Sequence, residues 1–147
     1  PLRAAAILAE CPPAIEDALS AAGSHLGLAY QLQDDLLSAF GEAGEHGKDP
    51  YSDIREGKQT AIVCFAKMTS AWSSIEAHFG DPDLTADAAR LVRSLLAECG
   101  AERFARDLVA DQLAAFHRIM DGDAAPLPVE VRDVLVGLAA QLEVRRS

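Results

Sequence analysis

Residues 25–40 read HLGLAYQLQDDLLSAF, and the fold prediction starts from this stretch. Leucine, alanine and aromatic residues fall on every side of a helix here, which is typical of a buried helix. One polar or small stripe interrupts them: Gly27, Gln31, Asp34, Asp35 and Ser38. Spacings of three and four residues place the last four close to one face. The stretch therefore predicts a buried helix that carries carboxylates on one face.

Adjacent carboxylates on a buried helix are costly. Each ion loses hydration and repels its neighbour, so one of the two takes up a proton unless a cation is supplied. Oxygen ligands with no Cys or His nearby suit a hard cation, which makes Mg²⁺ the natural candidate for Asp34 and Asp35. The alternative is an ordinary solvent-facing acidic pair, and the helix alone does not separate the two interpretations.

The pattern on both sides of this stretch is also helical. No segment shows strand alternation, and the helix-start and helix-stop signals are Pro13, Gly41, Thr85, Gly100 and Pro128. After an opening apolar run that ends at residues 11–13, the expected helices cover about 14–40, 59–79, 85–100, 101–120 and 128–146. We expect an all-α helical bundle, or part of one, with residues 1–147 in a single domain.

Charge and composition exclude several classes of function. The net charge is −10, which argues against nucleic acid as a partner. No apolar stretch is long enough to span a bilayer. The three cysteines, Cys11, Cys64 and Cys99, are far apart and lack metal-ligand spacing. They predict buried free thiols, and hence a protein of the reducing cytoplasm.

The expected loop over residues 41–58 is a local cluster of positive charge in this acidic chain. Lys48 and Lys58, two of only three lysines, bracket it together with Arg55. Acidic residues are interleaved with these cations, so a self-neutralising surface loop is one interpretation. Combined with the carboxylate pair, the loop suggests another, because metal ions can bridge carboxylates to a diphosphate while ammonium groups neutralise the remaining charge.

Two segments carry a family resemblance. Residues 23–42, GSHLGLAYQLQDDLLSAFGE, and residues 47–63, GKDPYSDIREGKQTAIV, resemble the second aspartate-rich region and the following loop of the trans-isoprenyl diphosphate synthases. The opening PLRAAAILAE resembles the segment before that region, so the likeness covers about residues 1–66. It implies the carboxyl-terminal half of an all-α bundle of the isoprenoid synthase type.

The resemblance also assigns residues to roles. It places magnesium on Asp34 and Asp35, with Gln31 as a supporting residue one turn earlier. It places Lys48 and Lys58 on the diphosphate, so that Asp34, Asp35 and Lys58 are the expected catalytic residues. Asp53 matches an acidic loop residue near the metals. In the family the third position of the motif is aspartate, whereas this chain has Ser38.

The implied reaction joins isopentenyl diphosphate to an allylic diphosphate and gives a longer all-trans prenyl diphosphate. The growing chain would lie in an apolar tunnel, and the protein would be a homodimer. The first aspartate-rich motif is absent from the 147 residues, so the chain alone is expected to be inactive. Two other interpretations are a non-catalytic partner subunit of such a synthase, which Ser38 permits, and an unrelated helical interaction domain.

Overall fold

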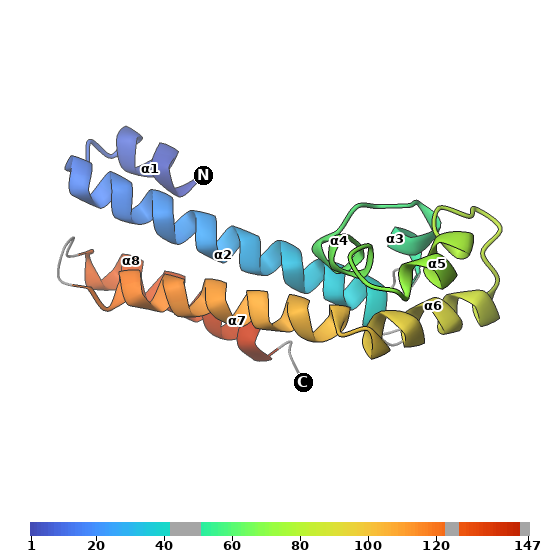
Figure 1. Ribbon diagram of the computed structural model, residues 1–147. Helices are drawn as coiled ribbons and strands as arrows, with labels where there is room; N and C mark the ends of the chain where they lie inside the picture. The colour runs from blue at the N-terminus through green and yellow to red at the C-terminus, as the bar shows by residue number, and fades with distance from the viewer. Residues whose placement is uncertain (42–50, 123–126, 145–147) are drawn as a thin grey trace. The chain divides into compact units, whose positions relative to one another are not determined.

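The computed structural model describes residues 1–41, 51–122 and 127–144, and these residues are helical with no strand (Figure 1). This confirms the predicted all-α fold. The α-helices are α1 (Leu2–Leu8), α2 (Pro13–Phe40), α3 (Ser52–Arg55), α4 (Ala61–Ala66), α5 (Trp72–Ile75), α6 (Ala86–Glu98), α7 (Ala101–Met120) and α8 (Val129–Val144), and the 3₁₀ helix η1 covers Glu76–His78.

Several helix ends lie where the sequence signals predicted them. Pro13 is the first residue of α2, where its missing N–H leaves no bond unmade. The Thr85 hydroxyl caps α6 by accepting a hydrogen bond from the backbone N–H of Ala88 at 3.2 Å. Gly100, with a φ of +87°, separates α6 from α7 in the left-handed conformation that glycine adopts without strain.

The prediction of one helix over residues 59–79 was wrong. Helix α4 ends at Ala66, and α5 and η1 follow as separate short pieces. The carbonyl of Ala66 accepts bonds from both the backbone N–H and the hydroxyl of Thr69, and the Met68 N–H donates to Phe65 three residues earlier. These hydrogen bonds join residues three apart. They replace the bonds between residues four apart that would continue the α-helix, and so they end α4. The loop predicted for residues 41–58 contains the short helix α3.

The chain divides into two compact units, and α2 and α7 each contribute to both. The first unit comprises residues 1–31 and 109–147. In it α1 packs on α2, where a methyl group built on Gly23 would lie 3.2 Å from Leu2 Cδ1. A hydrogen bond of 2.8 Å joins His25 of α2 to Gln112 of α7. Its buried core includes Ala22, Ala29, Val109, Leu113, Phe116, Leu135 and Ala139.

The second unit comprises residues 32–108 and contains the predicted carboxylates. The Phe65 ring of α4 stacks on Phe104 of α7 with centroids 4.6 Å apart. The guanidinium of Arg93 in α6 donates to the carbonyl of Gly41, just after the end of α2. Its buried core includes Leu32, Leu36, Ile54, Ile62, Val63, Ile75, Val92, Leu96 and Ala105. The last turns of α2 are thus surrounded by apolar packing within this unit.

Two burial expectations need correction. Leu28 and Tyr30 are about half exposed, so the earlier turns of α2 are not buried on every side among the described residues. All three cysteines are free, yet none is fully buried, and Cys64 is exposed. Cys64 lies on the face of α4 opposite the buried Ile62 and Ala66, because its position in the helical repeat points away from the core.

Two leucines of α6 provide a matched test of this packing. Leu96 is 1% exposed and Leu91 is 49% exposed. Leu96→Ala is expected to lower the free energy of unfolding by about 2–5 kcal/mol, because it leaves a cavity in the core. Leu91→Ala is expected to lower it by less than about 1 kcal/mol. Chemical denaturation measures both changes, and equal losses would contradict the packing described for α6.

Candidate functional site

Helix α2 positions the aspartate pair on its last turns. Asp35 is buried, at 7% exposure, whereas Asp34 and Ser38 are half-buried. Leu32 and Leu36, on the neighbouring positions of the helix, pack into the core of the second unit and fix the rotation of this segment. The buried carboxylate of Asp35 therefore needs a nearby cation or hydrogen bonds to offset the hydration that it loses.

The segment after α3 brings a lysine to this carboxylate. Asp53 lies in α3, and the backbone N–H of Lys58 donates to the Asp53 carbonyl at 2.9 Å. Gly57 makes the turn between them with a φ of +68°, a conformation that L side chains rarely adopt. The turn directs the Lys58 side chain back along α3.

The ammonium group of Lys58 is shared by two carboxylates. Its Nζ lies 3.2 and 3.3 Å from the two Asp53 carboxylate oxygens and 3.4 Å from Asp35 Oδ1. The side chains of Asp35 and Asp53 are only 9% and 12% exposed, whereas that of Lys58 is 42% exposed. Two nearly buried anions from separate elements thus meet one cation that is open to solvent.

This environment changes the pKa of Lys58. Burial acts to lower the pKa, but the hydrogen bond to Asp53 and its charge, followed by the charge and hydrogen bond of Asp35, outweigh burial. The pKa of Lys58 is therefore raised above its ordinary value of 10.5. The ammonium stays charged throughout the physiological range, as a group that binds a phosphate must.

The other predicted residues have different positions. Gln31 is exposed and lies in the part of α2 that belongs to the first unit. Lys48 lies outside the described residues. Among residues 1–41, 51–122 and 127–144 no group of three or more Asp, Glu, His or Cys side chains could hold a metal ion. Asp34 and Asp35 fit magnesium by ligand type, since their oxygens are hard donors, and they would supply part of a ligand set.

Sequence reasoning missed one buried polar side chain beside the pair. Gln33 is 4% exposed, and its Oε1 atom has no hydrogen-bond partner among the described residues. One signal could have identified it: Gln33 lies between Leu32 and the aspartate pair on a stretch of helix rich in leucine.

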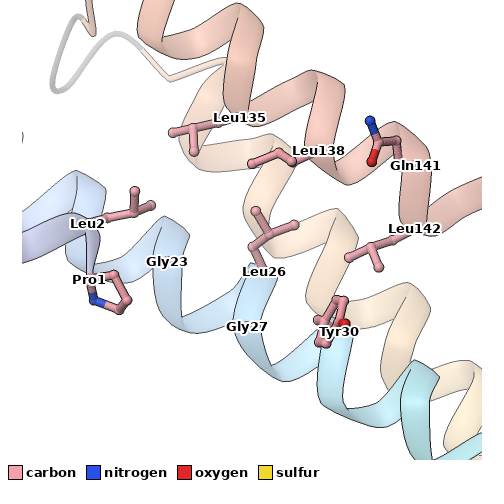
Figure 2. Close-up of a pocket in the computed structure, with 10 residues that line it drawn as sticks. All are labelled: Pro1, Leu2, Gly23, Leu26, Gly27, Tyr30, Leu135, Leu138, Gln141 and Leu142. Carbon is pink, nitrogen blue, oxygen red and sulfur yellow. The ribbon is translucent and has the colours of Figure 1, made fainter.

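The first unit contains an apolar groove of about 350 Å³ (Figure 2). The stick view shows Leu2 of α1, Leu26 of α2, and Leu138 and Leu142 of α8 around it. Gly23 and Gly27 provide its floor on α2, and a methyl group built on Gly27 would meet nothing within 4 Å. The lining is suited to an apolar ligand.

Solved structures of similar fold define the class of this helical protein. A geranylgeranyl pyrophosphate synthase from Corynebacterium glutamicum, crystallised with isoprenyl diphosphate and magnesium, matches with a TM-score of 0.83 and 30% identity, over 94% of this chain and 40% of that one. A polyprenyl synthase from Caulobacter crescentus matches with a TM-score of 0.80 and 30% identity, over 99% and 44%. The fold is that of the isoprenoid synthases.

The sequence comparisons identify the family. The polyprenyl synthetase model matches residues 1–94, and the chain belongs to that family. A (2E,6E)-farnesyl diphosphate synthase of Mycobacterium tuberculosis is 37% identical over 106 residues, which are 67% of this chain and 29% of the relative. A short chain isoprenyl diphosphate synthase of Methanocaldococcus jannaschii is 42% identical over 64 residues, 44% and 20% of the two chains. The chain thus matches less than a third of these curated relatives.

Within residues 1–41, 51–122 and 127–144, none of the helices combines the length and the hydropathy of a membrane span.

The contacts of the Lys58 ammonium with Asp53 and Asp35 predict how the pKa of Lys58 responds to mutation of either carboxylate. Asp53→Asn is expected to lower the pKa of Lys58 more than Asp35→Asn does, because the Asp53 bond is the larger of the two raising effects. A pKa raised by folding stabilises the folded state below the unfolded pKa, and this stabilisation is lost as pH rises through the folded value. The alkaline loss of stability should therefore be smaller, and should end at a lower pH, in Asp53→Asn.

NMR titration of the Lys58 side chain measures the pKa directly, and denaturation between pH 9 and 12 measures the stability. If Asp53→Asn left the pKa of Lys58 unchanged, this result would contradict the conclusion that Asp53 and Asp35 share the Lys58 ammonium.

Proposed function

We propose that this chain is part of a trans-prenyltransferase that condenses isopentenyl diphosphate with an allylic diphosphate. The observation that carries the proposal is the meeting of Asp35, Asp53 and Lys58, since it occurs in a member of a family whose curated relatives are prenyl diphosphate synthases. Carboxylates beside an exposed ammonium are suited to a diphosphate bound through a cation.

The residues of the chain have distinct tasks in this reaction. Asp34 and Asp35 would hold magnesium, which supplies Lewis-acid stabilisation of the diphosphate when bound. Lys58 would donate hydrogen bonds to the diphosphate oxygens, where negative charge grows as the leaving group departs. Asp53 would hold the Lys58 side chain in place through its two oxygens. Gln31 and Lys48 would add further contacts to the metal site and the diphosphate.

The chemistry proceeds in two stages. The bond between the allylic carbon and the diphosphate oxygen breaks, and its electron pair leaves with the diphosphate. The double bond of isopentenyl diphosphate then attacks the allylic cation, and loss of one proton restores an alkene.

A second candidate is a non-catalytic partner subunit of such a synthase. Ser38 favours it, because a hydroxyl replaces the charged oxygen of the third aspartate. Under either candidate we propose a homodimeric protein of the cytoplasm, where its three free cysteines would stay reduced.

Magnesium diphosphate binding tests the metal-binding residues. Asp34→Ala or Asp35→Ala is expected to weaken the binding of inorganic diphosphate in the presence of Mg²⁺ by at least about tenfold, since each change removes a charged ligand. Ser38→Ala is expected to weaken it by less than about threefold. NMR titration of the chain measures both, with circular dichroism as the control for folding. Equal losses from the serine and aspartate changes would show that Ser38 has an equivalent role.

Prenyltransferase activity is expected from a chimera but not from the chain alone. The 147 residues carry one aspartate-rich motif, and a diphosphate neutralised from one side keeps most of its barrier, with about 1.4 kcal/mol for each factor of ten in rate. A chimera in which the chain replaces the matching segment of the Corynebacterium glutamicum synthase should turn over radiolabelled isopentenyl diphosphate, and chelator should abolish this. A folded but inactive chimera would favour the partner-subunit candidate.

A further inference from the structure

The turn at Gly80, 22 residues after Lys58 in the sequence, contacts the backbone just before Lys58. The carbonyl of the buried Ile54 accepts hydrogen bonds from the N–H of Gly57 at 3.2 Å and from the N–H of Gly80 at 2.9 Å. Gly57 and Gly80 both have positive φ, +68° and +80°, and a methyl group built on Gly57 would lie 3.3 Å from Gly80 Cα. Because the two glycines pack backbone to backbone, the position of Gly57 depends on that of the turn at Gly80.

Lys67 connects the same turn to the residue just after Lys58. Its Nζ lies 5.1 Å from the centroid of the Trp72 ring and 5.8 Å from that of Phe79, the residue before Gly80. The same ammonium donates a hydrogen bond of 2.6 Å to the Gln59 side chain. The Lys67 ammonium thus contacts the rings of Trp72 and Phe79 and also the side chain of Gln59, the residue next to Lys58.

Gln59 completes the connection through its amide nitrogen, which donates to the carbonyl of Gly57 at 3.2 Å. The rings of Trp72 and Phe79 meet edge to face, 5.4 Å apart at 66°, so they form one surface for the ammonium. Lys67, Trp72 and Phe79 form a group that we term the lysine–aromatic cluster. Gln59, on one side of Lys58, is bonded directly to this cluster, and Gly57, on the other side, is bonded to Gln59.

We propose that Lys67 is a positioning residue: through the lysine–aromatic cluster it fixes residues 57–59 and so sets the Lys58 ammonium between Asp35 and Asp53. The part of the proposal that concerns diphosphate rests on the proposed function. Lys67 acts through Gln59 and through the backbone of Gly57.

The cluster is suited to local positioning rather than to overall stability. Lys67 and Gln59 are both exposed, and contacts of exposed charged side chains contribute little to global folding. An exposed cation–π contact is worth a factor of about two to five in an equilibrium constant. Loss of Lys67 should therefore free residues 57–59 while the helices remain folded.

Amide hydrogen exchange measures this freedom on the chain as it stands. Lys67→Met is expected to accelerate exchange at the N–H groups of Gly57, Lys58 and Gly80 by about two- to fivefold. Exchange at Leu113 in α7 should not change. Lys67→Arg should restore slow exchange, since guanidinium also stacks on aromatic rings and can donate to Gln59. Arg103→Met, which removes an 88% exposed charge on α7, is the matched control for net charge.

A double-mutant cycle tests whether Lys67 acts through Lys58. The affinity of the chain for inorganic diphosphate with Mg²⁺ is measured by NMR titration. Lys67→Met should lower it by about two- to fivefold, and Lys58→Met should lower it further. In the double mutant Lys67→Met should have no additional effect, because the group that it positions is gone.

The outcomes separate this proposal from the proposed function. Exchange in Lys67→Met that equals that in Arg103→Met would overturn the positioning role. A loss of affinity of the same size with and without Lys58→Met would also overturn it, because Lys67 would then act on diphosphate by another route. A parent chain that shows no binding of magnesium diphosphate would count against the proposed function, and hydrogen exchange alone would then decide the role of Lys67.

Discussion

The buried carboxylate of Asp35 is the constraint on which the second unit depends. An ion at 7% exposure loses most of its hydration, and apolar neighbours on α2 give nothing in return. Lys58 supplies the compensating charge from 23 residues further along the chain. Because the ammonium must reach both Asp35 and Asp53, the backbone between α3 and α4 has to turn back at Gly57. The positive φ of this glycine allows the chain to turn there without strain, so that Lys58 reaches both carboxylates.

Residues 57–63, GKQTAIV, combine a turn, a charged contact and a helix cap within one short segment. Gly57 makes the turn, Lys58 supplies the charge, and Gln59 bonds back to the Gly57 carbonyl. The Thr60 hydroxyl then caps α4 by accepting from the N–H of Val63, which is itself buried. Because Gln59 is bonded to Gly57, a change at either position should also affect the position of Lys58 between them.

Local signals predicted part of the fold well. Proline at the start of α2, threonine at the start of α6 and the limits of α7 all depend on bonds within one turn of the helix, and such bonds are encoded nearby in the sequence. The break after Ala66 was missed because apolar residues continue at helical spacing on both sides, and only the competing bonds of Thr69 end α4. The exposure of Leu28 and Tyr30 was missed because hydropathy does not specify which residues cover a helix face.

The candidate site was predictable by residue type but not by geometry. The aspartate pair and Lys58 were evident from pattern and resemblance, whereas the sharing of one ammonium by Asp35 and Asp53 depends on contacts across 23 and 5 residues. The lysine–aromatic cluster was missed for the same reason. Its members have no sequence pattern that marks them, and they are related to the site by the packing of Gly80 on Gly57 and by the hydrogen bonds of Gln59.

The serine at position 38 adds no charge beside the buried carboxylate of Asp35. A third carboxylate one turn after Asp34 would repel Asp34 and Asp35 and raise the cost of keeping the buried Asp35 ionised. A hydroxyl avoids that repulsion and can still hydrogen-bond a metal-bound water, but it offers a cation less charge. Asp53, 12% exposed and already beside Lys58, is the carboxylate best placed among the described residues to provide the missing negative charge. Under the proposed function, the departure from the family motif leaves one negative charge fewer on α2, so a larger share of the charge comes from Asp53 on α3, beside the turn that carries Lys58.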